Sequence, residues 1–187
     1  MSKIDKGRRI TMERDNYVIE LVNMQRDYLD QVIELLEDAR AFLLEQGIDQ
    51  WQNGYPSKDT IINDMELNHG YVFLVKGQVV AYAAIIFGDD PTYQKIYHGQ
   101  WKSQGPYFTV HRLMMKKEIR GTRCSSQVMS QILEFCTNHG IQNIRIDTHE
   151  DNKRMQGYVK KHKFEYCGVI HLLTGEERFA YEYCHDR

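Results

Sequence analysis

One stretch, residues 110–126, limits the folds open to this chain more than any other. It has the pattern of a buried strand, followed by a basic loop that contains Gly121 and by the start of an amphipathic helix. Backbone N–H groups at a helix N-terminus have no intrahelical partner, and the helix dipole favours an anion there. The order of strand, basic loop and helix therefore predicts a binding site for a phosphorylated ligand.

The overall composition sets broader limits. The chain has 187 residues, and we expect one domain over residues 16–187 after a disordered or vector-derived polar leader at residues 1–15. A formal net charge of −2 gives no electrostatic basis for binding nucleic acid, and no apolar run is long enough to cross a membrane. The four cysteines contain no C-x-x-C pair, which argues against a metal site and favours a cytoplasmic protein.

Apolar periodicity divides the chain into helices, where apolar residues recur every three or four positions, and strands, where they alternate. The predicted strands are 17–22, 71–75, 78–87, 107–115, 141–148, 164–173 and 178–184, and the predicted helices are 25–46, 57–67, one ending near 139, and 152–162. This order, βααβββαβαββ, indicates a mixed α/β layer fold with a helical crossover between parallel strands. The long polar segment at residues 89–106 is either a pocket wall or a partly ordered excursion.

From residue 17 to residue 184 the chain resembles the Gcn5-related N-acetyltransferase (GNAT) superfamily. The family's pyrophosphate-binding pattern, Arg/Gln-x-x-Gly-x-Gly/Ala after the fourth strand, aligns with Arg-Gly-Thr-Arg-Cys-Ser at residues 120–125. A second family pattern begins with an Asn after the fifth strand and ends in Gly-Phe, and it aligns with Asn152 and Lys163-Phe164. The resemblance implies a mixed, mostly antiparallel sheet of about seven strands flanked by about four helices.

Several positions depart from the family patterns. Arg123 replaces the first glycine of the loop, Ser125 replaces the second, and Lys163 replaces the glycine of the later pattern. The Tyr that often serves the family as general acid would fall on Val159, whereas Tyr158 precedes it by about 100° of helix rotation. At Arg123 a left-handed backbone would cost about 1–2 kcal/mol, whereas a helical backbone would cost almost nothing.

The resemblance implies acetyl-CoA as the co-substrate and no metal. Backbone groups of the fourth strand would hold the acyl group and the pantetheine arm, at Leu113, Met114 and Met115. The remaining predicted cofactor-binding residues lie in the loop, in the helix start and after the fifth strand: Arg120, Gly121, Thr122, Arg123, Cys124, Ser125 and Asn152. Asn152 is also placed to cap its own helix, and one side chain can do both.

Transfer of an acetyl group from a thioester to an ammonium needs a base and an acid. His111 is the predicted base, because it lies two residues before the pantetheine-binding stretch and imidazole titrates near neutrality. A histidine that is only hydrogen-bonded within the sheet is the alternative. Strand alternation predicts His111 on one face with Leu113 and Met115, and Met114 on the other face. Tyr158 is the second predicted catalytic residue, as the acid.

The acceptor is expected near the loop that follows the first helix. Trp51 and Tyr55 fall where the family forms its acceptor pocket, with anchoring of the loop as the alternative for Trp51. His149, just past the fifth strand, is a further substrate-binding candidate. Three carboxylates are candidates to pair with an acceptor ammonium: Glu45, Asp49 and Asp89.

The resemblance therefore predicts an acetyltransferase that moves an acetyl group from acetyl-CoA to a primary amine of a small-molecule or amino-acid-like acceptor by direct attack. The altered motif and acid positions leave two alternatives open: a catalytically impaired GNAT-fold module that binds CoA or regulates, and a transferase that uses another acyl-CoA. The expected partner is a small amine, with no nucleic acid or membrane. A homodimer remains open, since many members of this fold pair as dimers.

Overall fold

The computed structural model describes residues 18–88 and 90–185. Within these residues the strands are β1 (Glu20–Asn23), β2 (Gly70–Val75), β3 (Gln78–Phe87), β4 (Tyr107–Met115), β5 (Asn143–Thr148), β6 (Glu165–His171) and β7 (Glu177–Cys184). The α-helices are α1 (Leu29–Glu45), α2 (Lys58–Glu66), α3 (Arg123–Asn138) and α4 (Lys153–Lys161). Short 3-10 turns form at Arg26–Tyr28, Pro91–Tyr93 and Lys117–Ile119. The predicted order βααβββαβαββ is confirmed, while the predicted leader lies outside the described residues.

Local residue chemistry explains several of the element ends. Ser57 caps α2 through a reciprocal pair of hydrogen bonds with Thr60, which satisfies two backbone groups at the helix start. Gly47 follows α1 with a positive φ of 69°, a conformation that favours glycine after a helix. Lys76 and Gly77 join β2 to β3 with φ angles of 51° and 75°, as a tight two-residue hairpin requires.

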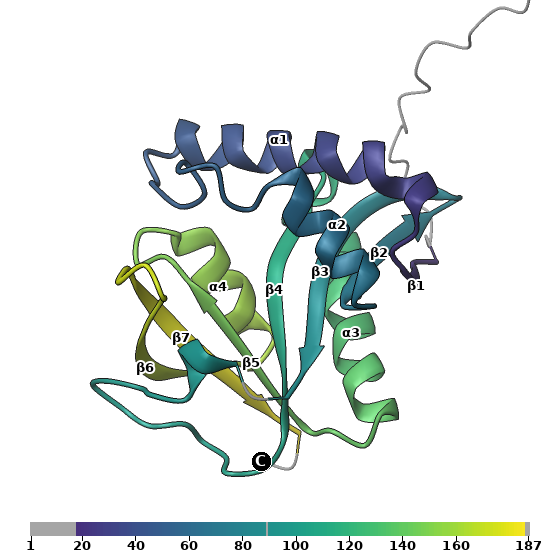
Figure 1. The fold of residues 1–187 in the computed structure, drawn as a ribbon. Helices are drawn as coiled ribbons and strands as arrows, with labels where there is room; N and C mark the ends of the chain where they lie inside the picture. The colour runs from purple at the N-terminus through teal and green to yellow at the C-terminus, as the bar shows by residue number, and fades with distance from the viewer. Residues whose placement is uncertain (1–17, 89, 186–187) are drawn as a thin grey trace, which may run out of the picture.

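The sheet has seven strands in the described part of the chain, in the order β1-β2-β3-β4-β5-β7-β6. All neighbours run antiparallel except β4 and β5, whose parallel pairing extends only from Tyr107 opposite Asn143 to Thr109 opposite Arg145. Figure 1 shows the two strands side by side at one end and apart at the other. Beyond Thr109, the free edge of β4 therefore has no strand partner among the described residues.

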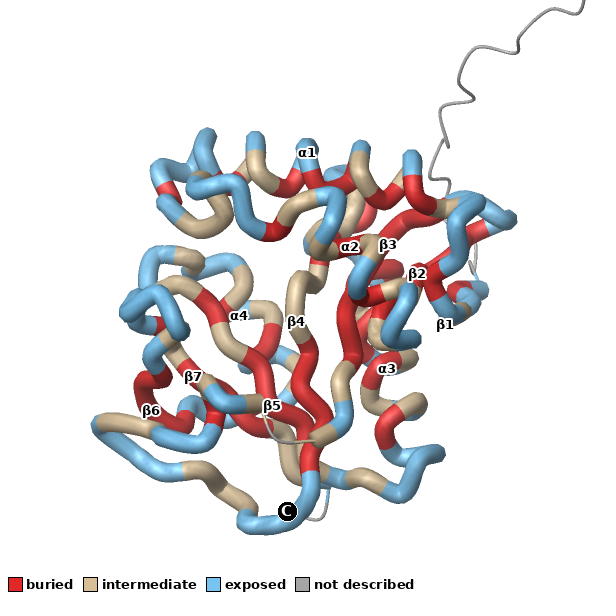
Figure 2. Tube along the Cα trace, in the orientation of Figure 1, coloured by how far each residue is buried: buried red, intermediate tan, exposed pale blue. Residues whose placement is uncertain are grey.

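Two hydrophobic cores lie on opposite faces of the sheet. One contains Val128, Met129 and Ile132 of α3 and Val159 of α4, packed on the strands. The other contains the apolar stripe of α1, with Ile61 of α2. Figure 2 shows that β3 is buried along most of its length, whereas β4 changes from buried to partly exposed in its second half. The helices thus cover both faces, and the second half of β4 faces a less filled space.

A β-bulge in β4 breaks the side-chain alternation that the sequence predicts. Ala84 of β3 pairs with His111, but Tyr82 pairs with Met114, so Ala83 alone stands opposite two residues of β4. Met114 consequently shares a face with His111. The prediction that Leu113 and Met115 would share the face of His111 is wrong: both pack against the core on the α3 side. Alternation along one strand cannot reveal an extra residue, because the bulge is defined by pairing with the neighbouring strand.

Arg112 occupies the bulge with a left-handed backbone, at φ 53°. Its Nε donates a hydrogen bond to Asp64 Oδ2 at 2.8 Å, and its Nη2 donates one to Asp64 Oδ1 at 2.6 Å, so the two side chains form a bidentate ion pair. Asp64 belongs to α2 and is 3% exposed, and it also accepts a hydrogen bond from the Tyr82 hydroxyl at 2.7 Å. The ion pair therefore ties the bulge of the central strand to the helix above it.

The segment at residues 90–106 packs against the sheet. Tyr93 is fully buried among Tyr107, Ile170 and Ala180. Farther along the segment, the Arg145 guanidinium lies between the rings of Trp101 and Tyr107, at 4.1 and 3.8 Å from their centroids. The segment is thus an ordered wall beside β5, the first of the two interpretations that the sequence left open.

We expect loss of either partner of the Asp64–Arg112 pair to be costly, because the remaining charge would stay buried without a counterion. Asp64→Ala and Arg112→Gln should each lower the free energy of unfolding by about 3–5 kcal/mol. The double variant Asp64→Ala/Arg112→Gln should lose much less than the sum of the two single losses. Urea denaturation of the four proteins measures this, and additive losses would show that the pair does not act as a unit.

Candidate active site

A cavity of about 840 Å³ opens where β4 and β5 separate. Its lining comes from both faces of the sheet: Ser125 and Tyr158 lie on the α3 and α4 side, whereas Asp90 and Tyr55 lie on the other. His111 and Leu113, on either side of the bulge, line it from the centre. The cavity therefore passes through the sheet, and its two ends carry different chemistry.

At one end the cavity meets the loop before α3. Gly121 lines it with a φ of 74°, and a side chain added there would meet no atom within 4 Å, so the loop is open on this side. Thr122 caps α3 by accepting a hydrogen bond from the backbone N–H of Cys124 at 3.2 Å. Ser125 also lines the cavity, and its hydroxyl donates to the Thr122 carbonyl at 2.8 Å. The start of a sixteen-residue helix is thus presented to the cavity, as an anion site requires.

Arg123 is the first residue of α3, has no positive φ and is exposed. The departure from glycine is therefore accommodated in a helical backbone, and Gly121 takes the left-handed position. Neither Arg123 nor Thr122 lines the cavity. Cys124 is also outside the lining, because its side chain is buried in the core on the α3 side.

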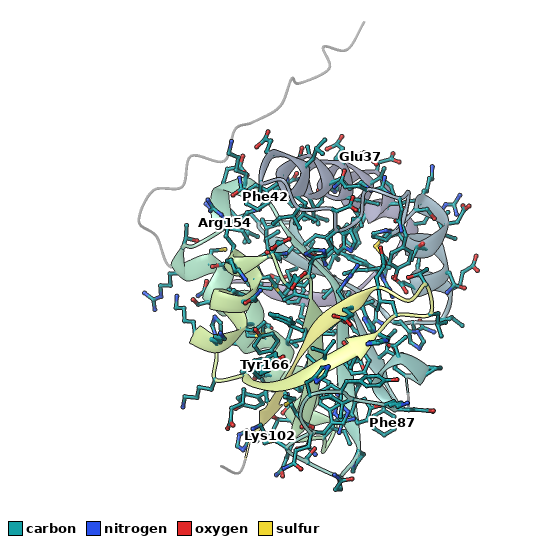
Figure 3. All side chains as sticks on the ribbon, turned by 90° about the vertical axis from the view of Figure 1, so that its left-hand side faces the viewer. Glu37, Phe42, Phe87, Lys102, Arg154 and Tyr166 are labelled. Atoms are coloured by element: carbon teal, nitrogen blue, oxygen red, sulfur yellow. The ribbon has the colours of Figure 1, made fainter. Side chains whose placement is uncertain are left out.

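Three cations surround this end of the cavity: Arg120, Arg154 and Lys161. The Arg120 Nε donates to the Met115 carbonyl at 2.9 Å, and its guanidinium lies 4.2 Å from the centroid of the Phe42 ring. Arg154 lies over the same ring from α4, at 5.4 Å, and Figure 3 shows Arg154 and Phe42 close together. Positive charge at a helix N-terminus makes this end suited to a phosphorylated group.

Asn152 and Tyr158 line the cavity from α4. The Asn152 Oδ1 accepts the Met155 N–H at 3.1 Å, so it caps the helix, and its Nδ2 donates to Gln50 Oε1 at 3.1 Å. The Tyr158 hydroxyl donates to the Ser125 carbonyl at 2.7 Å, and burial raises the pKa of Tyr158 above its usual value of 10. Val159, at the position of the family's acid, is 1% exposed in the core. Tyr158 is therefore the side chain that reaches the cavity.

At the other end His111 is flanked by two carboxylates. Its Nε2 lies 2.9 Å from Asp90 Oδ2, and its Nδ1 lies 3.9 Å from Asp147 Oδ1. The Tyr93 hydroxyl donates to the same Asp147 oxygen at 2.6 Å. Burial and the neighbouring Asp147 raise the pKa of Tyr93 well above 10, so this hydroxyl stays protonated. The imidazole is thus fixed between two acidic groups at the edge of the cavity.

Asp90 holds its charge over a wide pH range. Burial raises the pKa of Asp90, but hydrogen bonds from the His111 ring and from the Thr92 hydroxyl and N–H outweigh it and bring the pKa to about 2, against an ordinary 3.8. The Thr92 N–H and hydroxyl lie 2.8 and 2.6 Å from Asp90 Oδ1. A carboxylate held in this way can orient the imidazole beside it.

The predicted aromatic wall is present at this end. Trp51 and Tyr55 both line the cavity, and the Tyr55 hydroxyl accepts a hydrogen bond from Arg112 Nη1 at 2.7 Å. Trp51 also packs against the core under α1, so one side chain both lines the cavity and anchors its loop. The hairpin between β6 and β7 closes the same end with Leu172 and Leu173.

The cavity brings together most of the predicted site. The predicted residues that line it are Trp51, Tyr55, His111, Leu113, Met115, Arg120, Gly121, Ser125, Asn152 and Tyr158. Met114 and His149 do not: Met114 is buried under α1, and the His149 ring accepts the N–H of Asp151 at 3.1 Å.

Of the carboxylates proposed to meet an ammonium, Asp89 lies outside the described residues, and Glu45 and Asp49 lie away from the lining. The carboxylates that line the cavity are instead Asp90, Asp147 and Glu176, with Arg178 beside them, and sequence reasoning missed all four. Asp90 directly follows the predicted candidate, and Asp147 lies in the predicted fifth strand, but only the tertiary structure places either beside His111.

No helix among residues 18–88 and 90–185 is long and apolar enough to cross a membrane. Over the same described residues, no group of three or more His, Cys, Asp or Glu side chains is arranged to hold a metal ion.

Comparison with solved structures agrees with this architecture. An acetyltransferase of the GNAT family from Streptococcus agalactiae 2603 shares 31% identity with a TM-score of 0.81, over 90% of this chain and 96% of that one. A GNAT-family acetyltransferase from Listeria monocytogenes 4b F2365 has 17% identity and a TM-score of 0.68, over 90% and 99% of the two chains. The paia N-acetyltransferase of Thermoplasma acidophilum, solved in complex with coenzyme A, has 14% identity and a TM-score of 0.63, over 89% and 99%. The last two likenesses bear on the fold alone.

Comparison by sequence adds a second line of support. No curated protein gives a significant match. The sequence model of the Acetyltransferase (GNAT) family matches residues 29–164, which includes α1, the loop before α3 and the end of α4. Together with the seven-stranded sheet and the relative from Streptococcus agalactiae, this match shows that the chain belongs to the GNAT family of acetyltransferases.

Proposed function

We propose that this protein transfers an acetyl group from acetyl-CoA to the primary amine of a small acceptor by direct attack. The observation that carries the proposal is the cavity through the sheet, with an anion-binding loop at one end and a histidine between two carboxylates at the other. A phosphorylated acyl donor and an amine acceptor can enter such a cavity from opposite ends and meet at the bulge of β4.

The donor end fits coenzyme A. The residues proposed to hold the pyrophosphate are Arg120, Gly121 and Ser125 with the backbone N–H groups at the start of α3. Arg154 and Lys161 add positive charge for the remaining phosphate. The relative from Thermoplasma acidophilum, which has the same fold, was solved with coenzyme A, and this supports the assignment.

The unpaired edge of β4 provides the next part of the site. Past Thr109 this edge faces the cavity without a strand partner in the described chain, so backbone groups near Leu113 can bind an extended amide-containing arm, whereas the Met115 carbonyl already accepts a hydrogen bond from Arg120. Acetyl-CoA supplies an activated thioester, whose carbonyl such backbone groups can polarise.

His111 is the proposed base. A carboxylate can only accept, so Asp90 fixes the proton of the neutral imidazole on Nε2 and leaves Nδ1 as the basic nitrogen. Nδ1 removes a proton from the acceptor ammonium, and the resulting amine attacks the thioester carbon. The nitrogen of the adduct loses its second proton to solvent as the carbon–sulfur bond breaks, and the sulfur leaves as a thiolate that requires a proton, which solvent later restores to the residue that donates it.

Tyr158 is the proposed source of that proton. It lies on the donor side of the cavity, and burial raises its pKa, so the hydroxyl is protonated near neutral pH. Its proton is directed to the Ser125 carbonyl in this structure, so the hydroxyl must rotate toward the thiolate to act. The acceptor ammonium is drawn to the other end by Asp90 and Asp147.

Acetyl-CoA should stabilise the protein by about 2.7 kcal/mol when its concentration is 100 times its dissociation constant. Gly121→Val should weaken binding at least tenfold, because a β-branched residue is strained at φ 74° and would narrow the loop. The matched variant Arg123→Gly should bind as well as the parent protein, since Arg123 is exposed and does not line the cavity. Thermal denaturation with and without acetyl-CoA measures this stabilisation for the parent protein and for both variants. Absence of stabilisation at millimolar acetyl-CoA would overturn the proposed function.

His111→Ala should reduce turnover by roughly 10²–10⁴-fold with little change in acetyl-CoA affinity. Release of free CoA thiol across a panel of amines provides the measurement. A loss below tenfold would remove His111 from the role of base. Cofactor binding without thiol release for any amine would instead favour a CoA-binding module.

Asp90 should stabilise the folded state above about pH 4 and lose this contribution as the pH falls toward 2. The sign follows because the folded pKa of about 2 lies below the ordinary 3.8, so the unfolded chain binds the proton first. In Asp90→Asn the fall in stability between pH 4 and 2 should therefore be smaller than in the parent protein. Urea denaturation at several pH values tests this, and identical slopes would contradict it.

A further inference from the structure

We infer that the acceptor carries a carboxylate next to its amine, as an amino acid with an apolar side chain does, and that Arg178 binds this carboxylate. The inference rests on the proposed function and names the class of its acceptor. It comes from an arginine of β7 to which the transfer reaction itself assigns no role.

Arg178 is buried at 6% exposure and lines the acceptor end of the cavity. Its Nη1 donates to the Glu177 carbonyl at 2.8 Å, and its Nη2 donates to Glu176 Oε2 at 3.3 Å. A guanidinium has five N–H donors. The remaining three make no hydrogen bond to any described residue. A buried cation with unused donors beside a cavity is suited to an anionic ligand group.

The register of the sheet places an opposite charge next to Arg178. Asp147 of β5 pairs with Ala180 of β7, and Arg178 lies two residues from Ala180 on the same face. Such diagonal neighbours have Cα atoms about 7–8 Å apart. Within the described chain no ion pair joins Asp147 to Arg178, and only one oxygen of Asp147 accepts a hydrogen bond. The two charges are therefore held apart on one wall of the cavity.

A zwitterion matches this arrangement. Its ammonium can lie toward Asp147 and the free Nδ1 of His111, where it must lose a proton, while its carboxylate lies toward Arg178. Arg178 forms an ion pair with Glu176, but a second ammonium in place of the carboxylate could not accept a hydrogen bond from the unused N–H donors of Arg178. The charge pattern thus favours an amino acid over a diamine.

Apolar residues complete this end of the cavity. Leu172 and Leu173 come from the hairpin that also carries Glu176, and Trp51 comes from the loop after α1. Leu173 is 87% exposed, so its side chain is available to cover a ligand that enters here. These surfaces are suited to the side chain of leucine, methionine or phenylalanine.

The test compares each amino acid with the amine that lacks only its carboxylate: leucine with 3-methylbutylamine, methionine with 3-(methylthio)propylamine, and phenylalanine with phenethylamine. The parent protein should acetylate the amino acid of at least one pair with a kcat/KM on the order of 10²–10⁴ higher, the effect of about two charge-assisted hydrogen bonds. Arg178→Gln should abolish this preference by raising the KM of the amino acid, with kcat/KM for the amine changed by less than about threefold. Arg178→Lys should retain part of the preference for the amino acid over the amine.

Arg154→Gln is the matched control, because it removes a cavity cation at the donor end. It should raise the KM for acetyl-CoA and leave the ratio between amino acid and amine unchanged. Stabilisation of Arg178→Gln by acetyl-CoA shows that this variant is folded. The inference is overturned if the parent protein prefers the amines, if Arg178→Gln keeps the preference, or if the acetyl-CoA-stabilised protein neither acetylates nor binds any of the amino acids in calorimetry. Failure of the proposed function would give a different result, the absence of stabilisation by acetyl-CoA. That result would overturn the proposed function and this inference together.

Discussion

The bidentate ion pair between Asp64 and Arg112 is the interaction on which the arrangement of the site depends. It holds Arg112 in a left-handed conformation in the middle of the central strand, through Nε–Oδ2 and Nη2–Oδ1 contacts of 2.8 and 2.6 Å. The bulge there reverses the alternation of β4, so His111 faces the acceptor side while Leu113 faces the donor side. Because the pair is buried and also receives the Tyr82 hydroxyl, α2 and the bulge are fixed relative to each other.

The separation of β4 from β5 is the second constraint. A parallel pair that ends at Thr109 leaves an unpaired edge beside a cavity, and a sheet without this separation would bury the same edge in hydrogen bonds. The proposed function uses this one continuous space, with a phosphorylated donor on the α3 side and an amine on the other. The two ends of the cavity differ in charge, because the start of α3 and the nearby cations lie at one end, whereas Asp90 and Asp147 lie at the other end.

The departures from the family's glycine pattern have a local explanation. The loop before α3 contains one left-handed residue, Gly121, so Arg123 begins the helix at no backbone cost. A similar adjustment occurs in α4, where Val159 packs into the core and Tyr158 points into the cavity. The altered positions at Arg123 and Val159 therefore change which side chains surround the donor end, whereas Lys163 has a left-handed backbone at φ 67°.

The sequence by itself determined the order of elements, the strand, loop and helix start around residues 110–126 and the general place of His111, because periodicity, glycine and helix starts are encoded locally. It also placed Arg120, Gly121 and Ser125 close together in this stretch, and these three residues line the cavity. Only the tertiary structure decided the bulge at Arg112, and with it the faces of Leu113, Met114 and Met115. Tertiary structure also brought Asp90, Asp147 and Arg178 to one end of the cavity. Their positions follow from strand register and from the packing of residues 90–106 against β5, β6 and β7. The residue spacing within one segment does not reveal which distant segment it pairs with, so the sequence alone could not predict these contacts.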